Sequence, residues 1–147
     1  MRKVDLGITI VRVIVGLIFF AHGMDKVVRG LGNTMDYFAS LGIPGFLAIA
    51  VAFIELVGGL ALILGLGTRL VATMLIPVML GAIYFVHWPE GLMRSAAGAG
   101  YELNLILLGA CLHLALSGSN YFAVDSLLEK TGAEYSTKIG KWIIEKR

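Results

Sequence analysis

The sequence predicts an all-α, polytopic membrane protein: an antiparallel four-helix transmembrane bundle with a polar stripe along its interior. Hydrophobic residues make up 58% of the chain and charged residues 15%, against about 25% in an average soluble domain. Nine of the 22 charged residues (12 Lys and Arg plus 10 Asp and Glu) lie in the last 23 positions. The rest of the chain therefore has too few polar groups to cover the surface of a soluble globule. The third observation is a series of four long apolar segments.

These segments approach the roughly 20 residues that a helix needs to cross a bilayer. The predicted spans are about 6–24, 46–66, 69–87 and 101–117. Pro44 precedes the second span, where its missing N–H costs nothing. Gly65 and Gly67 fit a short turn that makes the second and third spans an antiparallel hairpin. Trp88 ends the third span at a membrane interface, where tryptophan is favoured.

Outside the spans, the sequence predicts one surface helix and one tail. Asn33 and Thr34 are expected to cap a short helix over residues 35–41 at the membrane surface. Residues 1–120 are expected to form the transmembrane domain, and residues 121–147 an amphipathic, basic tail on the cytoplasmic side. Eight lysines and arginines fall on the side of both termini and three on the other, so the positive-inside rule places both termini in the cytoplasm.

Composition also limits the partners and the chemistry. A net charge of +2 with dispersed basic residues argues against nucleic acid as a partner, whereas a lipid bilayer is required. Cys111 is the single cysteine, so an intrachain disulfide or a cysteine-rich zinc site is excluded, and no metal site is expected.

Each predicted span carries polar residues on one face, where ionisable side chains normally turn toward the protein interior. At 100° per residue the first stripe contains Arg12, His22 and Lys26, and the second contains Glu55, Gly58 and Gly59. The third and fourth stripes are Arg69, Thr73, Tyr84 and His87, and Glu102, Gly109 and His113. We expect Arg12 and Glu55 at similar heights, joined as a structural ion pair that fixes the helix register. The Gly58-Gly59 pair indicates close helix packing.

One group of polar residues exceeds what packing requires. Alternating chain direction brings His22, His87 and Glu102 to the outer side of the membrane from three different spans. Two imidazoles and a carboxylate at one depth predict a ligand or proton-handling site, so these three are the expected catalytic residues. Neighbouring side chains are expected to contact substrate: Lys26, Tyr84, Trp88 and Asn104. Lys26 could instead be an interfacial residue whose charge extends to water.

Two motifs carry a family resemblance. The first span contains RVIVGLIFFAHGMDK, residues 12–26, and the second ELVGGLALILGLGTRL, residues 55–70. The fourth span begins with GYELNL and is followed by SGSNYFAVD, ending at Asp125. Over about residues 4–125 this pattern resembles the DoxX family of small bacterial membrane proteins. The resemblance implies a four-span bundle in the bacterial cytoplasmic membrane and a link to quinone or thiol redox. The loop GLGNTMDYFASLGIPGFLA, residues 30–48, is most similar to the branch connected with catechol and quinone detoxification.

The predicted function is therefore a membrane oxidoreductase, or a redox accessory subunit, that acts on quinone- or catechol-type compounds. Flavin, NAD and iron–sulfur signatures are absent from the sequence, so the cofactor is unidentified apart from a quinone, and electrons must come from a redox partner or a diffusible reductant. A homo-oligomer is compatible with this function. Three alternatives stay open: a small transporter that uses Glu55, a non-catalytic scaffold, and a b-type haem protein with His22 and His87 as axial ligands.

Overall fold

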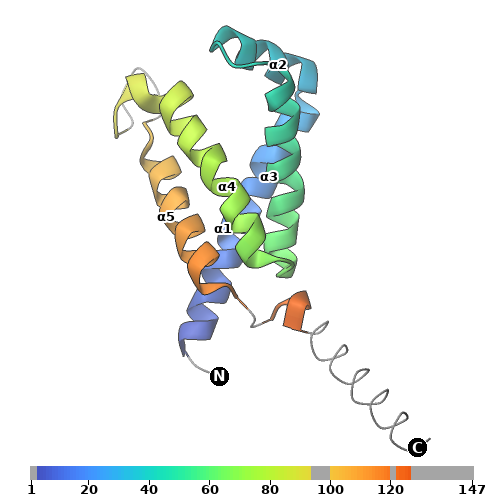
Figure 1. Ribbon diagram of the computed structural model, residues 1–147, viewed down its shortest axis with the longest axis vertical. Coiled ribbons are helices and arrows are strands. Elements are labelled where there is room, and N and C mark those ends of the chain that lie inside the picture. The colour runs from blue at the N-terminus through green and yellow to red at the C-terminus, as the bar shows by residue number, and fades with distance from the viewer. Residues whose placement is uncertain (1–2, 94–99, 120–121, 127–147) are drawn as a thin grey trace, which may run out of the picture.

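The computed structural model describes residues 3–93, 100–119 and 122–126, and every regular element in these ranges is a helix (Figure 1). The elements are α1 (Lys3–Val28), α2 (Leu31–Ser40), α3 (Phe46–Leu64), α4 (Thr68–Gly81) and α5 (Glu102–Ser117). Helix α4 continues into a π-helical segment, η1 (Ala82–His87), and a 3₁₀ turn, η2 (Trp88–Glu90). The predicted all-α class is confirmed. Most of the predicted tail, residues 127–147, lies outside the described residues.

Within the described ranges, three helical segments are long and apolar enough to cross a membrane. They are Lys3–Val28, Phe46–Leu64 and Thr68–Glu90, with 26, 19 and 23 residues. The fourth apolar helix, α5, has 16 residues. At 1.5 Å per residue it extends about 24 Å, somewhat less than the roughly 30 Å of a hydrocarbon core. The chain is a membrane protein with several spanning helices, and a full crossing by α5 stays a prediction.

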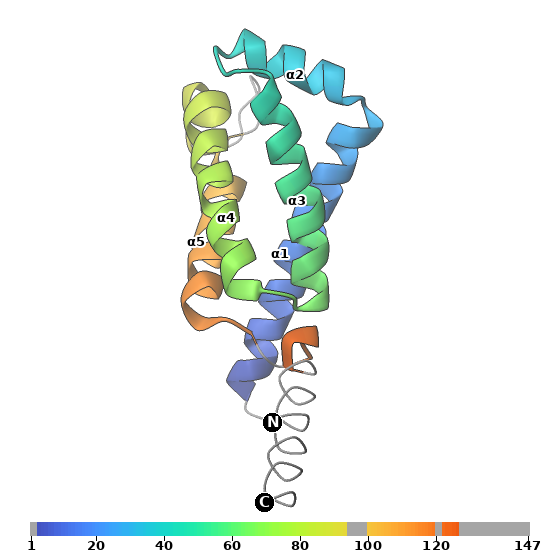
Figure 2. The same ribbon diagram turned by 45° about the vertical axis from the view of Figure 1, so that its right-hand side comes forward.

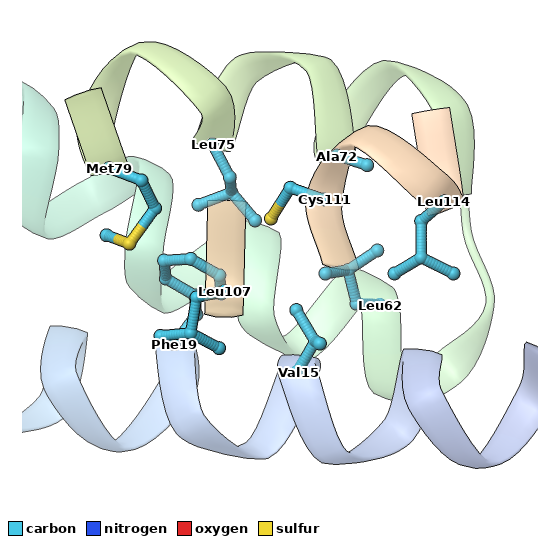
Figure 3. Packing of buried hydrophobic residues seen from close by; sticks show 9 residues of the cluster. All are labelled: Val15, Phe19, Leu62, Ala72, Leu75, Met79, Leu107, Cys111 and Leu114. Carbon is cyan, nitrogen blue, oxygen red and sulfur yellow. The ribbon is translucent and has the colours of Figure 1, made fainter. Parts of the chain in front are cut away.

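The hydrophobic core lies where α1, α3, α4 and α5 meet. Figure 3 shows its nine residues, which come from all four helices. They are Val15, Phe19, Leu62, Ala72, Leu75, Met79, Leu107, Cys111 and Leu114. Burial of these side chains joins the α4–α5 pair to the α1–α3 pair.

Glycines bring the backbones of α1 and α3 into direct contact. A Cβ added at Gly16 would lie 2.8 Å from the carbonyl oxygen of Gly59. A Cβ at Gly59 would overlap the backbone of Phe20 in turn. Farther along the same antiparallel contact, a Cβ at Gly23 would overlap the backbone of Leu56. The packing predicted from the glycine pair in α3 is therefore confirmed, and these contacts fix the register between the two helices.

The turn between α3 and α4 depends on glycine as the sequence predicts. Gly65 and Gly67 have φ angles of 73° and 55°, in the left-handed region that side-chain-bearing residues rarely adopt. The N–H groups of Gly65 and Leu66 donate to the carbonyls of Leu62 and Ala61, respectively. These bonds give the last carbonyl groups of α3 hydrogen-bond partners. The turn joins α3 directly to α4, and the two helices diverge from it toward α2 (Figure 1).

Arg12 forms hydrogen bonds that stabilise the end of the molecule where this turn lies. Its guanidinium is 1% exposed and donates to the carbonyl and the hydroxyl of Ser119, at 3.2 and 3.1 Å, and to the carbonyl of Phe122 at 2.8 Å. Asp125 lies close enough to interact electrostatically with Arg12, and its carboxylate accepts a 2.7 Å bond from the N–H of Gly67. The described beginning of the predicted tail thus packs under the α3–α4 turn.

Arg12→Met is expected to destabilise the protein by about 3 kcal/mol, because it removes the donor to the buried carbonyl and hydroxyl oxygens of Ser119. Arg69→Met is the matched control: Arg69 also donates to a carbonyl at the end of α5, that of Ser117 at 3.2 Å, but it is exposed. Thermal unfolding of both variants in detergent measures the difference. Equal destabilisation by the two substitutions would contradict the role given to Arg12.

Helix α2 begins earlier than the sequence predicts, at Leu31. Asn33 and Thr34 lie inside it instead of capping it. The Asn33 amide donates to the carbonyl of Arg29 at 2.7 Å, and the Thr34 hydroxyl donates to that of Gly30 at 3.4 Å. The helix begins at Leu31 because Gly30 has a φ of 96°, a non-helical conformation that separates α1 from α2.

Most residues of the polar stripes predicted for the third and fourth spans do not face the interior, whereas His87 and Glu102 are half-buried. Arg69, Thr73 and Tyr84 are exposed, as are Gly109 and His113. The hydroxyls of Thr73 and Ser117 bond carbonyls of their own helices, at 2.8 and 2.7 Å, so these helices need no polar interior. Their apolar residues take the buried face, and an interior with buried charge is found along α1 and α3.

Candidate functional site

A cavity of about 950 Å³ lies at the end of the molecule that carries α2. Residues of α1, α2, α3, α4, η1 and α5 line it, and most of them are apolar. The cavity occupies the region where the α1–α3 pair and the α4–α5 pair diverge (Figure 2). Its volume lies at the upper end of the range of about 300–1,000 Å³ typical of small-molecule sites.

An ion pair lies in the wall of this cavity. The Nζ atom of Lys26 on α1 is 2.5 Å from an Oε atom of Glu55 on α3. Their side chains are 22% and 5% exposed, so the carboxylate is almost fully buried and the ammonium is partly accessible from the cavity. Buried charged groups of this kind are stable when they are paired. In membrane proteins, such pairs mark ligand or ion sites.

The ion pair predicted between Arg12 and Glu55 is wrong. The glycine contacts explain why: Gly16 faces Gly59 across antiparallel helices, and Arg12 and Glu55 each lie four residues before these glycines. Because the helices are antiparallel, four residues back along α1 and four residues back along α3 lead in opposite directions. Arg12 and Glu55 are therefore about 12 Å apart along the helix axes. Lys26 instead reaches Glu55, because Gly23, three residues before Lys26, contacts Leu56.

Three more of the predicted site residues line the same cavity: His22 from α1, His87 from η1 and Asn104 from α5. The Asn104 amide lies 3.9 Å from the sulfur of Met79, inside the junction of α4 and α5. The structure therefore brings one face of each of four helical segments to a common space, as the alternating chain direction predicts.

Tyr84, Trp88 and Glu102 are not among the residues that line the cavity. Tyr84 is 69% exposed and points away, because the π-helical path of η1 advances less than 100° per residue and shifts its neighbours onto the cavity wall. Trp88 stacks on Tyr101, with ring centroids 5.9 Å apart. Glu102 begins α5 beside Gly100, at the same end of the molecule.

Sequence reasoning missed the contribution of α2. Thr34, Tyr37 and Phe38 line the cavity, and their spacing of three and four residues is the helical signal that could have placed them on one face. Asp25, in the last turn of α1, and Arg29, just after the helix, also line it and form an exposed 2.7 Å ion pair. Helix α2 therefore covers the cavity on the side away from the α3–α4 turn.

The lining can supply hydrogen bonds and charge but offers no evident metal site. Lys26 is a donor, Glu55 an acceptor, and His22 and His87 can be either, depending on their protonation. Within the described part of the chain, no group of three or more His, Cys, Asp and Glu side chains is arranged to hold a metal ion.

Fold and cavity together define the class: a small multi-span α-helical membrane protein with an ion pair in the wall of a largely apolar cavity. Comparison with known sequences agrees, since the DoxX family profile matches residues 7–88. The chain belongs to the DoxX family.

Three relatives cover almost the whole chain. The protein named "Putative oxidoreductase CatD" of Bacillus subtilis is 37% identical over 129 residues, which are 88% of this chain and 92% of the relative. The inner membrane protein YqjF of Escherichia coli is 29% identical, covering 88% and 98% of the two chains. The inner membrane protein YphA of Escherichia coli is 31% identical, covering 85% and 96%. No solved structure gives a significant match.

Proposed function

We propose that this protein is a membrane oxidoreductase, or a redox accessory subunit, whose cavity binds a quinone- or catechol-type ring. The observation that carries the proposal is the placement of the Lys26–Glu55 ion pair in the wall of a largely apolar cavity that His22 and His87 also line. Membership of the DoxX family and the oxidoreductase name of the Bacillus subtilis relative support a redox role.

The residues match the needs of such a ring. A quinone has two carbonyl oxygens that accept hydrogen bonds, and its reduction to the diphenol consumes two electrons and two protons. Lys26 and the two histidines can donate to these oxygens, and Glu55 can accept from a phenolic hydroxyl. The electrons come from a redox partner protein or a diffusible reductant.

Ring binding is tested with the protein in lipid nanodiscs, by titration with a substituted benzoquinone and with a catechol. We expect His87→Leu to weaken binding about tenfold, because a charged or buried hydrogen bond contributes about 1.5 kcal/mol to binding. His113→Leu is the matched control, because His113 is exposed on α5 and does not line the cavity. An equal effect of both substitutions, or no binding by the unchanged protein, would refute the proposal.

We also propose that the protein lies in the bacterial cytoplasmic membrane with both termini in the cytoplasm. The excess of basic residues on the side of the termini supports this orientation, and two relatives are named as inner membrane proteins. Single cysteines introduced in α2 and at the α3–α4 turn, in a Cys111→Ser background, test the orientation in intact cells. A membrane-impermeant thiol reagent should label α2 and leave the turn unlabelled.

A transporter is the second candidate, since Glu55 is a membrane-embedded carboxylate that lines a cavity. Uptake of candidate substrates by sealed vesicles with an imposed pH gradient distinguishes a transporter from a ring-binding oxidoreductase. Transport lost in Glu55→Gln, without any ring binding, would favour the transporter. If neither binding nor transport occurs and the variants leave the cellular phenotype unchanged, the scaffold alternative is favoured.

A further inference from the structure

We infer that the natural ligand is amphipathic and dissolved in the membrane, with a polar ring beside Lys26 and Glu55 and an apolar tail that leaves the cavity between α3 and α4. This inference rests on the proposed function and specifies its substrate class. It assigns the cavity an opening to lipid and excludes a small, water-borne ring as the natural ligand.

The first argument is size. A volume of about 950 Å³ approaches the upper limit of about 1,000 Å³ for pockets that enclose whole drug-sized molecules. A single ring leaves most of such a space unfilled. Because empty apolar space forfeits the contacts that stabilise packed interiors, a further apolar part of the ligand would fit the remaining volume.

The second argument is the separation of polar from apolar lining. Polar side chains line the cavity on α1, α2, η1 and α5 and, on α3, at Glu55. The walls that α3 and α4 present to each other beyond Glu55 are apolar, with Ala50, Val51 and Ile54 on α3 and Met74, Pro77 and Val78 on α4. A ligand that matches this lining has a polar head and an apolar continuation.

The third argument is that the apolar wall is open. Leu47 and Met74 line the cavity, yet they are 39% and 44% exposed, and Ala50 and Pro77 are exposed as well. Figure 1 shows α3 and α4 separating from their turn toward the α2 end. Since both helices are long and apolar enough to cross a membrane, their separation faces acyl chains rather than water.

Two glycines provide a matched test of this route. Gly81 lines the cavity near the end of α4, and Gly109 lies exposed on α5 outside the cavity. A Cβ at either position meets nothing within 4 Å, so a side chain can begin at each without an overlap at its Cβ. Gly81→Trp is therefore expected to fill the tail path, and Gly109→Trp to leave it open.

The probe is a benzoquinone with a ten-carbon chain that ends in a photoreactive diazirine, applied to the protein in nanodiscs. After irradiation, we expect adducts on residues 47–54 of α3, 74–81 of α4 and 82–85 of η1. We expect at least tenfold less of them in Gly81→Trp and an unchanged amount in Gly109→Trp. A methyl-substituted benzoquinone without a chain should compete with the probe.

The outcomes distinguish failure of the tail path from failure of the proposed function. Competition by the short ring, with adducts on α2 or with equal labelling of both tryptophan variants, would overturn the tail path while ring binding stands. Adducts between α3 and α4 that the short ring does not displace, and that a diazirine phospholipid reproduces, would overturn the proposed function and confirm the opening to lipid.

Discussion

Gly59→Ala is expected to destabilise the protein by about 3 kcal/mol, the upper range for overpacking of a close contact. The added methyl group would overlap the backbone of Phe20 and lie 2.8 Å from the carbonyl oxygen of Gly16. Because both contacts are with backbone, a rotamer change cannot relieve them, and α1 must move away from α3 along their whole contact. At this chain length the loss corresponds to a melting temperature lower by about 10 °C, measured in detergent.

Gly109→Ala is the control for this substitution. It also replaces glycine by alanine within an apolar helix, where alanine is favoured by about 1 kcal/mol, but its Cβ meets nothing within 4 Å. We therefore expect Gly109→Ala to be neutral or stabilising, and the difference between the two variants to report the α1–α3 contact. A Gly59→Ala variant as stable as Gly109→Ala would show that the two helices tolerate separation.

The span positions could be predicted from the sequence because they depend on local composition. The length of an apolar segment fixes where a helix crosses lipid, and Gly65 and Gly67 mark a turn through their φ angles. Most of the predicted helix ends therefore lie within a few residues of the observed ends. Helix α2 differs because Gly30, a single residue with positive φ, decides where it begins.

The partners of the buried charges could not be predicted, because they depend on the register between helices. Sliding one helix along the other exchanges one partner for another, and the register is set by backbone contacts at Gly16, Gly23 and Gly59. Each of these glycines is visible in the sequence, but which one faces which is a property of the packed pair. Depth counted from helix ends therefore placed Glu55 opposite Arg12 instead of Lys26.

The interior faces of the last two helices were mispredicted for a different reason. Polar residues in a membrane helix need not turn inward if their hydrogen bonds are made within the helix, as those of Thr73 and Ser117 are. The face that contributes Leu107, Cys111 and Leu114 to the core is buried instead. The π-helical segment after α4 adds a change of periodicity that a constant 100° per residue cannot anticipate.

Breaking the Lys26–Glu55 pair on one side only is expected to cost about 3 kcal/mol, whereas replacing both partners should cost little. Glu55→Gln leaves an ammonium in a largely apolar cavity, and Lys26→Met leaves a carboxylate that is 5% exposed. An uncompensated buried charge is expensive, while an apolar pair of similar volume is often neutral or stabilising. The double variant Lys26→Met/Glu55→Leu should therefore unfold close to the temperature of the unchanged protein.

The double variant also separates stability from function. If the pair holds the ring, Lys26→Met/Glu55→Leu should be stable and yet bind the benzoquinone at least tenfold more weakly than the unchanged protein. For stability, Asp25→Asn is the matched control, because the Asp25–Arg29 pair is 52% and 76% exposed and should contribute less than about 1 kcal/mol. A stable double variant with undiminished binding would leave the pair a purely structural role, and the ring would then have to bind through the histidines alone.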